Sequence, residues 1–195
     1  MNCRADMKKV GILGGTFDPP HIGHLIVANE VREALGLDEV RLMPNSVPPH
    51  KKKNGQAAAD DRLEMVRLAV KTNPGLSAEG IELSREGLSY TYDTMAELKE
   101  LEPDSAFYFI IGADMIEYLP KWHKIDELVK LVQFAGVRRP NHSIETPYPV
   151  KMVEMPQIEL SSSIIRERIK DGRPIQYLVT EEVRSYIEVN GLYGS

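Results

Sequence analysis

The hydrophobic positions of this chain fall into two alternating kinds of segment. Short apolar runs rich in β-branched and aromatic residues are typical of buried strands, and between them apolar residues recur every three or four positions, as on one face of a helix. The predicted strands are KKVGILGG (8–15), EVRLMP (39–44), LSAEGIEL (76–83), AFYFIIG (106–112), QFAGVRR (133–139) and QIEL (157–160). The predicted helices cover residues 25–35, 60–73, 91–101, 125–131, 162–170 and 180–190.

Strands that alternate with helices form parallel βαβ units. The pattern therefore predicts an α/β fold: a doubly wound, mostly parallel, Rossmann-like sheet with helices on both faces and a small helical C-terminal region. Gly36 is expected to end the first helix, and Asp60 or Asp61 to cap the second. The stretch from Pro140 to Pro156 receives no element.

Ligands of such sheets bind at the carboxyl ends of the strands, where the strand order reverses. GGTFDPPH (14–21) follows the first predicted strand, and GAD (112–114) follows the strand that contains FYFII. Both loops are therefore expected at this edge of the sheet.

Length and composition set bounds on the kind of protein. The 195 residues suit one domain, with residues 1–6 expected to be a disordered N-terminal extension. No apolar run approaches the ~20 residues that cross a bilayer, and no signal peptide precedes the first strand, so no membrane partner is expected. The single cysteine, Cys3, cannot form an internal disulfide, which favours a reducing cytoplasm.

The net charge of −5 argues against sequence-independent nucleic-acid binding, which usually needs a basic excess. One local basic cluster, HKKK at 50–53, contains Lys51. It is interpreted either as a solvated loop or as a mobile arm that closes on phosphates.

The loop after the first strand combines several features of a phosphate site. Gly14 and Gly15 lack a Cβ, so a ligand can approach the backbone and an unusual φ is cheap. Pro19 and Pro20 favour entry into the first turn of a helix, whose free N–H groups attract an anion. The loop nevertheless fits neither the P-loop pattern nor GxGxxG.

His21 and His24 stand three residues apart, which makes them neighbours on one helix face. They could be core histidines, a zinc pair or phosphate contacts. A zinc pair is disfavoured because no second ligand pair stands out among the other histidines and Cys3. Gly23 between them weakens a helix, which suggests that something passes close to its backbone.

A second candidate phosphate site is LSSSIIRERIK at 160–170. Ser161 or Ser162 can cap the helix, and its first turn offers hydroxyls and backbone donors to an anion. Arg166 lies one turn further on, where its planar guanidinium could reach the same anion. Alone, this pattern is also that of an ordinary capped helix.

Together the two motifs resemble the nucleotidyltransferase superfamily, whose first motif ends in His-x-Gly-His and whose second reads Ile-Ser-Ser-Thr/Ser-x-x-Arg. Leu160 replaces the isoleucine, which is a conservative departure. The letters HIGH also resemble class I aminoacyl-tRNA synthetases. Those enzymes need a KMSKS loop and a tRNA-binding domain, whereas VKMVEM at 150–155 is no match and the chain is too short.

The remaining motifs narrow the resemblance. PNSVPPHK, REGLSYTYDT, FIIGADM, YLPKW and NGLY occur in the order found in bacterial nicotinate mononucleotide adenylyltransferases, and the likeness runs from Met7 to the end of the chain. It implies that His21, His24 and Arg166 are catalytic. The residues implied to bind ATP are Gly14, Gly15, Thr16, Phe17, His21, His24, Gly112, Asp114, Ser162, Ser163 and Arg166.

The same resemblance implies the site of the second substrate. Trp122 would stack on the pyridine ring, and the backbone near Thr91 and Tyr118 would meet the nicotinate carboxylate. Lys51 and Lys121 complete the implied substrate-binding set. From the residues alone, Trp122 could equally be a core residue, although its neighbours in LPKWHK favour partial exposure.

The resemblance implies adenylyl transfer from ATP to nicotinate mononucleotide, with Mg²⁺ bound to ATP. Substrate phosphate is ionised near neutral pH, since its second pKa is about 6, so no general base is needed. Two alternatives stay open: a phosphopantetheine adenylyltransferase, which should lack SYTYDT with LPKW, and a catalytically silent nucleotide-binding module. A homo-oligomer also stays open.

Overall fold

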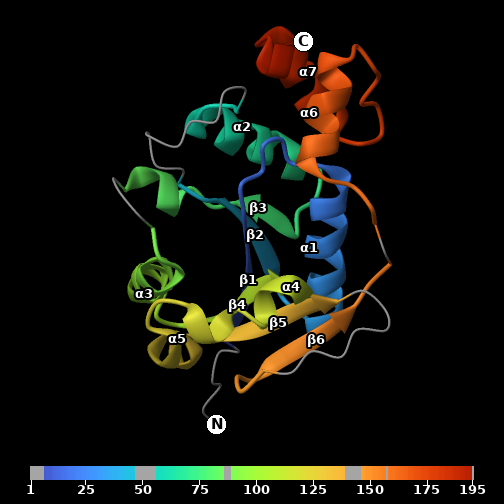
Figure 1. The fold of residues 1–195 in the computed structure, drawn as a ribbon. Helices are drawn as coiled ribbons and strands as arrows, with labels where there is room; N and C mark the ends of the chain where they lie inside the picture. Colours follow the sequence, from blue (N-terminus) through green and yellow to red (C-terminus); the bar gives the residue numbers. More distant parts are fainter. Residues whose placement is uncertain (1–6, 47–55, 86–88, 139–145, 157, 195) are drawn as a thin grey trace.

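A single sheet of parallel strands forms the centre of the molecule in the computed structural model, which describes residues 7–46, 56–85, 89–138, 146–156 and 158–194. Within these ranges the strand order is β3-β2-β1-β4-β5-β6 (Figure 1). The strands are β1 (Lys8–Gly15), β2 (Glu39–Pro44), β3 (Leu76–Ala78), β4 (Ser105–Gly112), β5 (Val132–Arg138) and β6 (Val150–Glu154). The order reverses between β1 and β4, as a doubly wound sheet requires.

Helices cover both faces of the sheet. They are α1 (Ile22–Leu35), α2 (Ala59–Val70), α3 (Thr91–Leu101), α4 (Ala113–Ile116), α5 (Ile125–Leu131), α6 (Ser162–Lys170) and α7 (Glu181–Val189), with short 3₁₀ turns η2 (Ile81–Ser84), η3 (Leu119–Lys121) and η4 (Leu192–Gly194). Met95 of α3 and Leu128 of α5 pack with Ile12 on one face. Val31 of α1 and Val66 of α2 pack on the other. The predicted fold class is therefore confirmed.

A third apolar cluster joins the C-terminal helices to the rest. Met65 of α2 packs with Ile165 of α6 and with Val183 and Ile187 of α7. Figure 1 shows α6 and α7 together beyond the start of α1, near the C-terminus. The chain end is thus held against the same end of the sheet as the predicted loops.

Three predicted details are wrong. The strand predicted at 76–83 ends at Ala78, and Ile81–Ser84 turns as a 3₁₀ helix instead. Residues 158–160 are not a strand; the edge strand is Val150–Glu154, inside the stretch left without an element. The cap of α2 is Ala58, while Asp60 and Asp61 lie in the first turn. Gly36 does end α1, in the left-handed conformation at φ 59°.

Several predictions fall outside the described residues: the disordered extension at 1–6, Cys3, and Lys51 with the rest of HKKK. None of the helices in the described ranges combines the length and the apolar character of a membrane span.

Candidate active site

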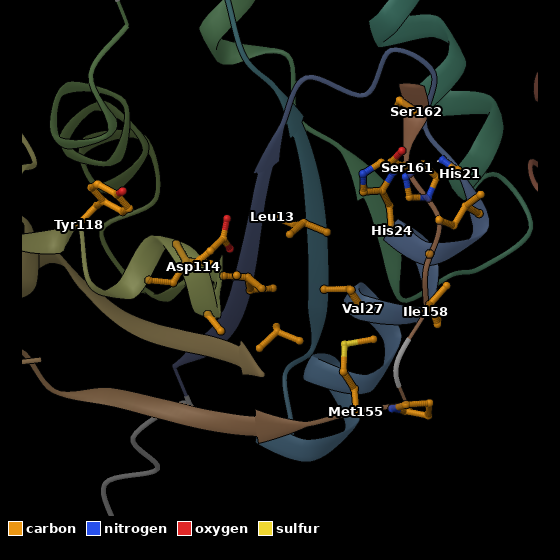
Figure 2. Close-up of a pocket in the computed structure, with 18 of the residues that line it drawn as sticks. Leu13, His21, His24, Val27, Asp114, Tyr118, Met155, Ile158, Ser161 and Ser162 are labelled. Atoms are coloured by element: carbon orange, nitrogen blue, oxygen red, sulfur yellow. Dashed lines mark hydrogen bonds between the residues drawn. The ribbon is translucent and has the colours of Figure 1, made fainter. Parts of the chain in front are cut away.

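A cleft of about 1050 Å³ opens where the strand order reverses. Leu13 at the end of β1, Ile110 of β4 and Val137 of β5 form part of its apolar lining. Figure 2 shows His21, His24, Ser161 and Ser162 on one side of the cleft and Asp114 and Tyr118 on the other. Both predicted loops therefore reach one cleft at the carboxyl edge of the sheet.

The two histidines are in direct contact. His21 is the residue before α1 and His24 lies in its first turn, and their rings stack with centroids 3.6 Å apart at an interplanar angle of 21°. The backbone N–H of His21 donates to Nδ1 of His24 over 3.1 Å. Since Nδ1 accepts this bond, the hydrogen of the neutral His24 ring is on Nε2, which leaves Nε2–H as a donor.

Both imidazoles are neutral near pH 7 in the unliganded protein. Burial lowers the pKa of His21 to about 4. Burial and the neighbouring His21 lower the pKa of His24 to about 3. Nδ1 of His21 is buried and has no hydrogen-bond partner among the described residues. The pair is therefore a set of neutral polar groups facing a cleft.

The His21 ring accounts for the glycine at position 23, because it packs against the Gly23 backbone. A Cβ on Gly23 would lie 3.0 Å from Nδ1 of His21 and 3.1 Å from Cε1, tighter than ordinary contact. The group that passes close to this backbone is thus the His21 ring. Similarly, a Cβ on Gly15 would lie 3.0 Å from the Phe17 ring.

The turn before the histidines differs from prediction in its backbone. The left-handed residue is Phe17, at φ 50°, and neither Gly14 nor Gly15 has a positive φ. The Phe17 ring is buried and meets His24 edge-on, with centroids 4.8 Å apart. Phe17 thus packs against His24 from behind. Gly14, Gly15, Thr16 and Phe17, like Ser163 and Arg166, are not among the residues that line this cleft.

The helix start offers fewer backbone donors than expected. The N–H of Ile22 donates to the Leu178 carbonyl over 2.9 Å, and that of His24 donates to the His21 carbonyl over 2.9 Å. Attraction of an anion therefore depends more on the side chains here than on the start of α1.

The second motif joins the first. Ser161 caps α6 by accepting from the Ile164 N–H over 3.3 Å. The Ser162 hydroxyl donates to the Pro19 carbonyl over 2.8 Å, and Arg166 Nη1 donates to the Asp18 carbonyl over 2.6 Å. Arg166 Nη2 also donates to Ser163 Oγ over 3.2 Å. These contacts hold the start of α6 against the histidine loop.

The opposite wall carries two of the residues predicted to bind ATP. Gly112 and Asp114, at the end of β4 and in α4, line the cleft with Tyr118. Tyr118 is exposed, and the Lys121 ammonium lies 5.2 Å from its ring centroid. The backbone N–H of Tyr118 donates to the Met115 carbonyl over 3.1 Å, so this group is already paired.

Three predicted substrate residues, Thr91, Lys121 and Trp122, do not line this cleft. Thr91 is the first residue of α3. Trp122 is half-buried and meets the rings of Phe109 and Phe134 edge-on, with centroids 5.9 and 6.0 Å apart. It therefore contributes to the core while keeping part of its surface exposed.

Sequence reasoning missed two buried charged residues behind the first loop. Arg62 is 2% exposed and donates to the carbonyls of Thr16 and Asn45 over 2.9 and 3.0 Å. Asp18 is 1% exposed and accepts from the Ala57 N–H and the Tyr193 hydroxyl. Asp18 is part of the GGTFDPPH motif, but its type alone does not show that it is buried. Arg62 is part of an amphipathic helix, and the sequence pattern does not distinguish a buried arginine there from an exposed one.

Among the residues that the structure describes, no three His, Cys, Asp or Glu side chains gather as metal ligands would. The described chain thus offers no ready-made metal cage beside the cleft.

The chain is similar to a known protein family and to individual members of it. Residues 12–168 match the cytidylyltransferase-like family model. A probable nicotinate-nucleotide adenylyltransferase of Geobacillus thermodenitrificans is 59% identical over 189 residues, covering 97% of this chain and 88% of that protein. The nicotinate-nucleotide adenylyltransferase of Bacillus subtilis is 53% identical over 189 residues, covering 97% and 100%.

The fold has solved counterparts. Plasmodium falciparum nicotinic acid mononucleotide adenylyltransferase complexed with NaAD superposes with a TM-score of 0.77 at 22% identity, covering 95% of this chain and 97% of that one. The resemblance drawn from the motifs is confirmed by the close relatives. The chain belongs to the cytidylyltransferase-like family and, within it, to the nicotinate-nucleotide adenylyltransferases.

Proposed function

We propose that this enzyme transfers the adenylyl group of ATP to nicotinate mononucleotide, releasing pyrophosphate and forming nicotinate adenine dinucleotide, a step of NAD biosynthesis. The reaction is proposed to take place in the cytoplasm, on one domain spanning residues 1–195. The relatives' names and the motif order support this substrate pair.

One observation carries the proposal. Two motifs more than 140 residues apart, each able to bind phosphate, are hydrogen-bonded to each other through Ser162 to Pro19 and Arg166 to Asp18. They meet at the cleft where the sheet order reverses. A nucleoside triphosphate is the ligand whose phosphates would contact both motifs at once.

The chemistry needs positioning and charge stabilisation more than proton transfer. A phosphate oxygen of the mononucleotide attacks the α-phosphorus of ATP, and the bond from that phosphorus to the bridging oxygen of pyrophosphate breaks. Since the attacking phosphate is already ionised near pH 7, with a second pKa of about 6, no protein base is required. Negative charge grows on the departing pyrophosphate and must be stabilised.

The histidine pair suits that task. Nδ1 of His24 already accepts a hydrogen bond from the His21 backbone N–H. In the neutral ring the hydrogen is therefore on Nε2, which can donate to a phosphate oxygen. A bound triphosphate would favour protonation of both rings, since a nearby negative charge raises a histidine pKa. Arg166, with Ser162 and Ser163 beside it, adds a permanent positive charge from the other motif. Lys51 is proposed as a further phosphate contact.

We propose Mg²⁺ as the divalent ion, entering with ATP. Mg²⁺ keeps several waters and prefers phosphate oxygens to an all-protein cage. When bound, it adds positive charge to the triphosphate. The described cleft fits this arrangement, because its hydroxyl and imidazole groups would face the phosphates and no three metal-ligating side chains gather among the described residues to form a separate ion site.

The mononucleotide is proposed to bind beyond Asp114 and Tyr118, toward Thr91, Lys121 and Trp122. The amide of Tyr118 is already paired, so backbone donors for the carboxylate would come from the first turn of α3, which begins at Thr91. A carboxylate only accepts hydrogen bonds, whereas a carboxamide also presents donors. Such a site would favour the nicotinate form.

The test is pyrophosphate release from ATP and Mg²⁺ with three acceptors in separate reactions: nicotinate mononucleotide, nicotinamide mononucleotide and phosphopantetheine. We expect fastest release with nicotinate mononucleotide. Fastest release with phosphopantetheine would replace the proposed acceptor, and no release with any acceptor would make the chain a silent binding module.

A further inference from the structure

A buried polar cluster lies behind the phosphate side of the cleft, outside the cleft lining. Its centre is the carboxylate of Asp18, which is 1% exposed. Oδ1 accepts from the Tyr193 hydroxyl over 2.7 Å and from the Ala57 N–H over 3.0 Å. Oδ2 has no hydrogen-bond partner among the described residues and lies 3.8 Å from Arg166 Nη1.

Asp18 meets Arg166 in two ways. Its backbone carbonyl accepts from Arg166 Nη1 over 2.6 Å, and its carboxylate faces the same nitrogen. The position of the guanidinium therefore depends on how the Asp18 residue is oriented. A hydrogen bond to a carboxylate is directional, so the group that holds Oδ1 also directs Oδ2 toward Arg166.

Tyr193 is the group that holds Oδ1 from the chain end. It lies in η4, is 8% exposed, and has a left-handed backbone with φ 63°. Burial and the Asp18 carboxylate raise the pKa of Tyr193, so its hydroxyl stays protonated and donates. The η4 turn packs on α6, the helix that carries Arg166.

We propose that Tyr193 is a positioning residue for adenylyl transfer: through the Asp18 carboxylate, its hydroxyl sets the orientation of Arg166 toward the triphosphate. Tyr193 touches no substrate in this scheme and acts only through Asp18 and Arg166. The inference rests on the proposed function and on the proposed role of Arg166 in binding phosphate.

The chain offers a matched control. Tyr186 of α7 also packs in the C-terminal cluster, and its hydroxyl donates to Asp61 Oδ1 over 2.9 Å. Tyr193→Phe and Tyr186→Phe each remove one hydroxyl and one tyrosine–aspartate hydrogen bond. Only the first bond leads to Arg166.

The experiment measures kcat and KM for pyrophosphate release from ATP, Mg²⁺ and nicotinate mononucleotide, using the full chain. We expect Tyr193→Phe to lower kcat about tenfold, because small misplacements of a positioned group are costly in rate. KM for nicotinate mononucleotide should change by less than about twofold, because this substrate is bound across the cleft. Tyr186→Phe should leave both constants within about twofold of wild type.

A double-mutant cycle separates positioning from general loosening. If Tyr193 acts through Arg166, Tyr193→Phe should change kcat by less than about threefold in an Arg166→Lys background, because coupled residues are non-additive. A full, independent tenfold loss in that background would overturn the inference. So would equal kinetics of Tyr193→Phe and Tyr186→Phe.

If the Tyr193→Phe protein does not fold, the Asp18→Asn variant tests the same scheme. It keeps an acceptor for Tyr193 and Ala57 but removes the charge facing Arg166, and it should lower kcat by the same order; unchanged kcat would refute the scheme. The wild-type reaction is run first. An inactive wild type refutes the proposed function itself, before any variant is compared.

Discussion

The orientation of the His24 ring is the detail at residue scale with the clearest chemical consequence. Nδ1 accepts the His21 amide, so Nε2–H is the donor available to a phosphate. His24→Asn keeps an acceptor near the Nδ1 position and removes Nε2–H. We expect kcat to fall about 10²-fold, as when one oxyanion donor is lost, while the melting temperature changes by only a few degrees. Steady-state kinetics and thermal unfolding measure the two effects.

The opposite pattern would assign His24 to the fold. A His24→Asn protein that melts far lower, yet whose folded fraction turns over like wild type, would show that the ring only fills space beside Phe17 and His21.

The depressed pKa of each histidine also predicts a pH dependence of stability. An unfolded histidine titrates near 6.5, whereas folding holds His21 at about 4 and His24 at about 3. The unfolded chain therefore binds more protons below pH 6.5, and stability present above that pH is lost as the pH falls toward 4. Urea unfolding at pH 7 and pH 5 should show a smaller loss for His24→Asn than for wild type. An equal loss in both proteins would mean that His24 titrates normally.

At the scale of one element, glycines at the two ends of α1 are expected to have different roles. Gly23→Ala should favour the helix by roughly 1 kcal/mol, yet its Cβ would press on the His21 ring. Gly36→Ala changes the other end, where φ is 59° and a Cβ meets nothing within 4 Å. We expect Gly23→Ala to lose activity with little loss of stability, and Gly36→Ala to lose about 1 kcal/mol of stability with activity kept. Steady-state kinetics and urea unfolding of both variants test whether one loses activity and the other loses stability.

Two outcomes would count against this explanation of Gly23. Wild-type kinetics in Gly23→Ala would mean that the His21 ring is free to move away. Equal loss of activity in Gly36→Ala would mean that any weakening of α1 is harmful, wherever it occurs.

Most elements could be predicted because their hydrophobic period matches their burial. β2, α3 and α5 have the predicted bounds, since each has a uniform pattern with clear ends. The edge strand Val150–Glu154 could not be predicted, because it carries exposed Lys151 and Met152 and pairs on one side only with β5. QIEL alternates like a strand, but residues 158–160 pass along the cleft beside the histidines instead.

At the scale of the whole molecule, the sequence could predict which loops meet but not what lies behind them. Parallel topology alone brings His21 and Asp114 to one edge. The buried contacts of Asp18 with Ala57 and Tyr193 join residues 39 and 175 positions apart, and no local pattern reports such pairs. For the same reason, the packing of Trp122 between two core rings could not be separated in advance from an exposed stacking position.

Substrate choice is a property of the whole cleft. We expect kcat/KM for nicotinate mononucleotide to exceed that for nicotinamide mononucleotide by ~10² to 10⁴, because a carboxamide would leave a buried donor unpaired. Trp122→Ala should raise KM for both mononucleotides and lower Tm, since the ring also packs on Phe109, but it should leave their ratio unchanged. Equal kcat/KM for the two mononucleotides in the wild-type protein would refute a carboxylate-reading site.

The most direct test of adenylyl transfer follows the phosphorus atoms of ATP. ATP labelled at the α-phosphate, and ATP labelled at the γ-phosphate, are each incubated with the protein, Mg²⁺ and nicotinate mononucleotide, and the products are separated. We expect the α label to appear in nicotinate adenine dinucleotide and the γ label to appear only in pyrophosphate. A γ label on the mononucleotide, or an α label found only in free AMP, would contradict attack of the mononucleotide phosphate on the α-phosphorus.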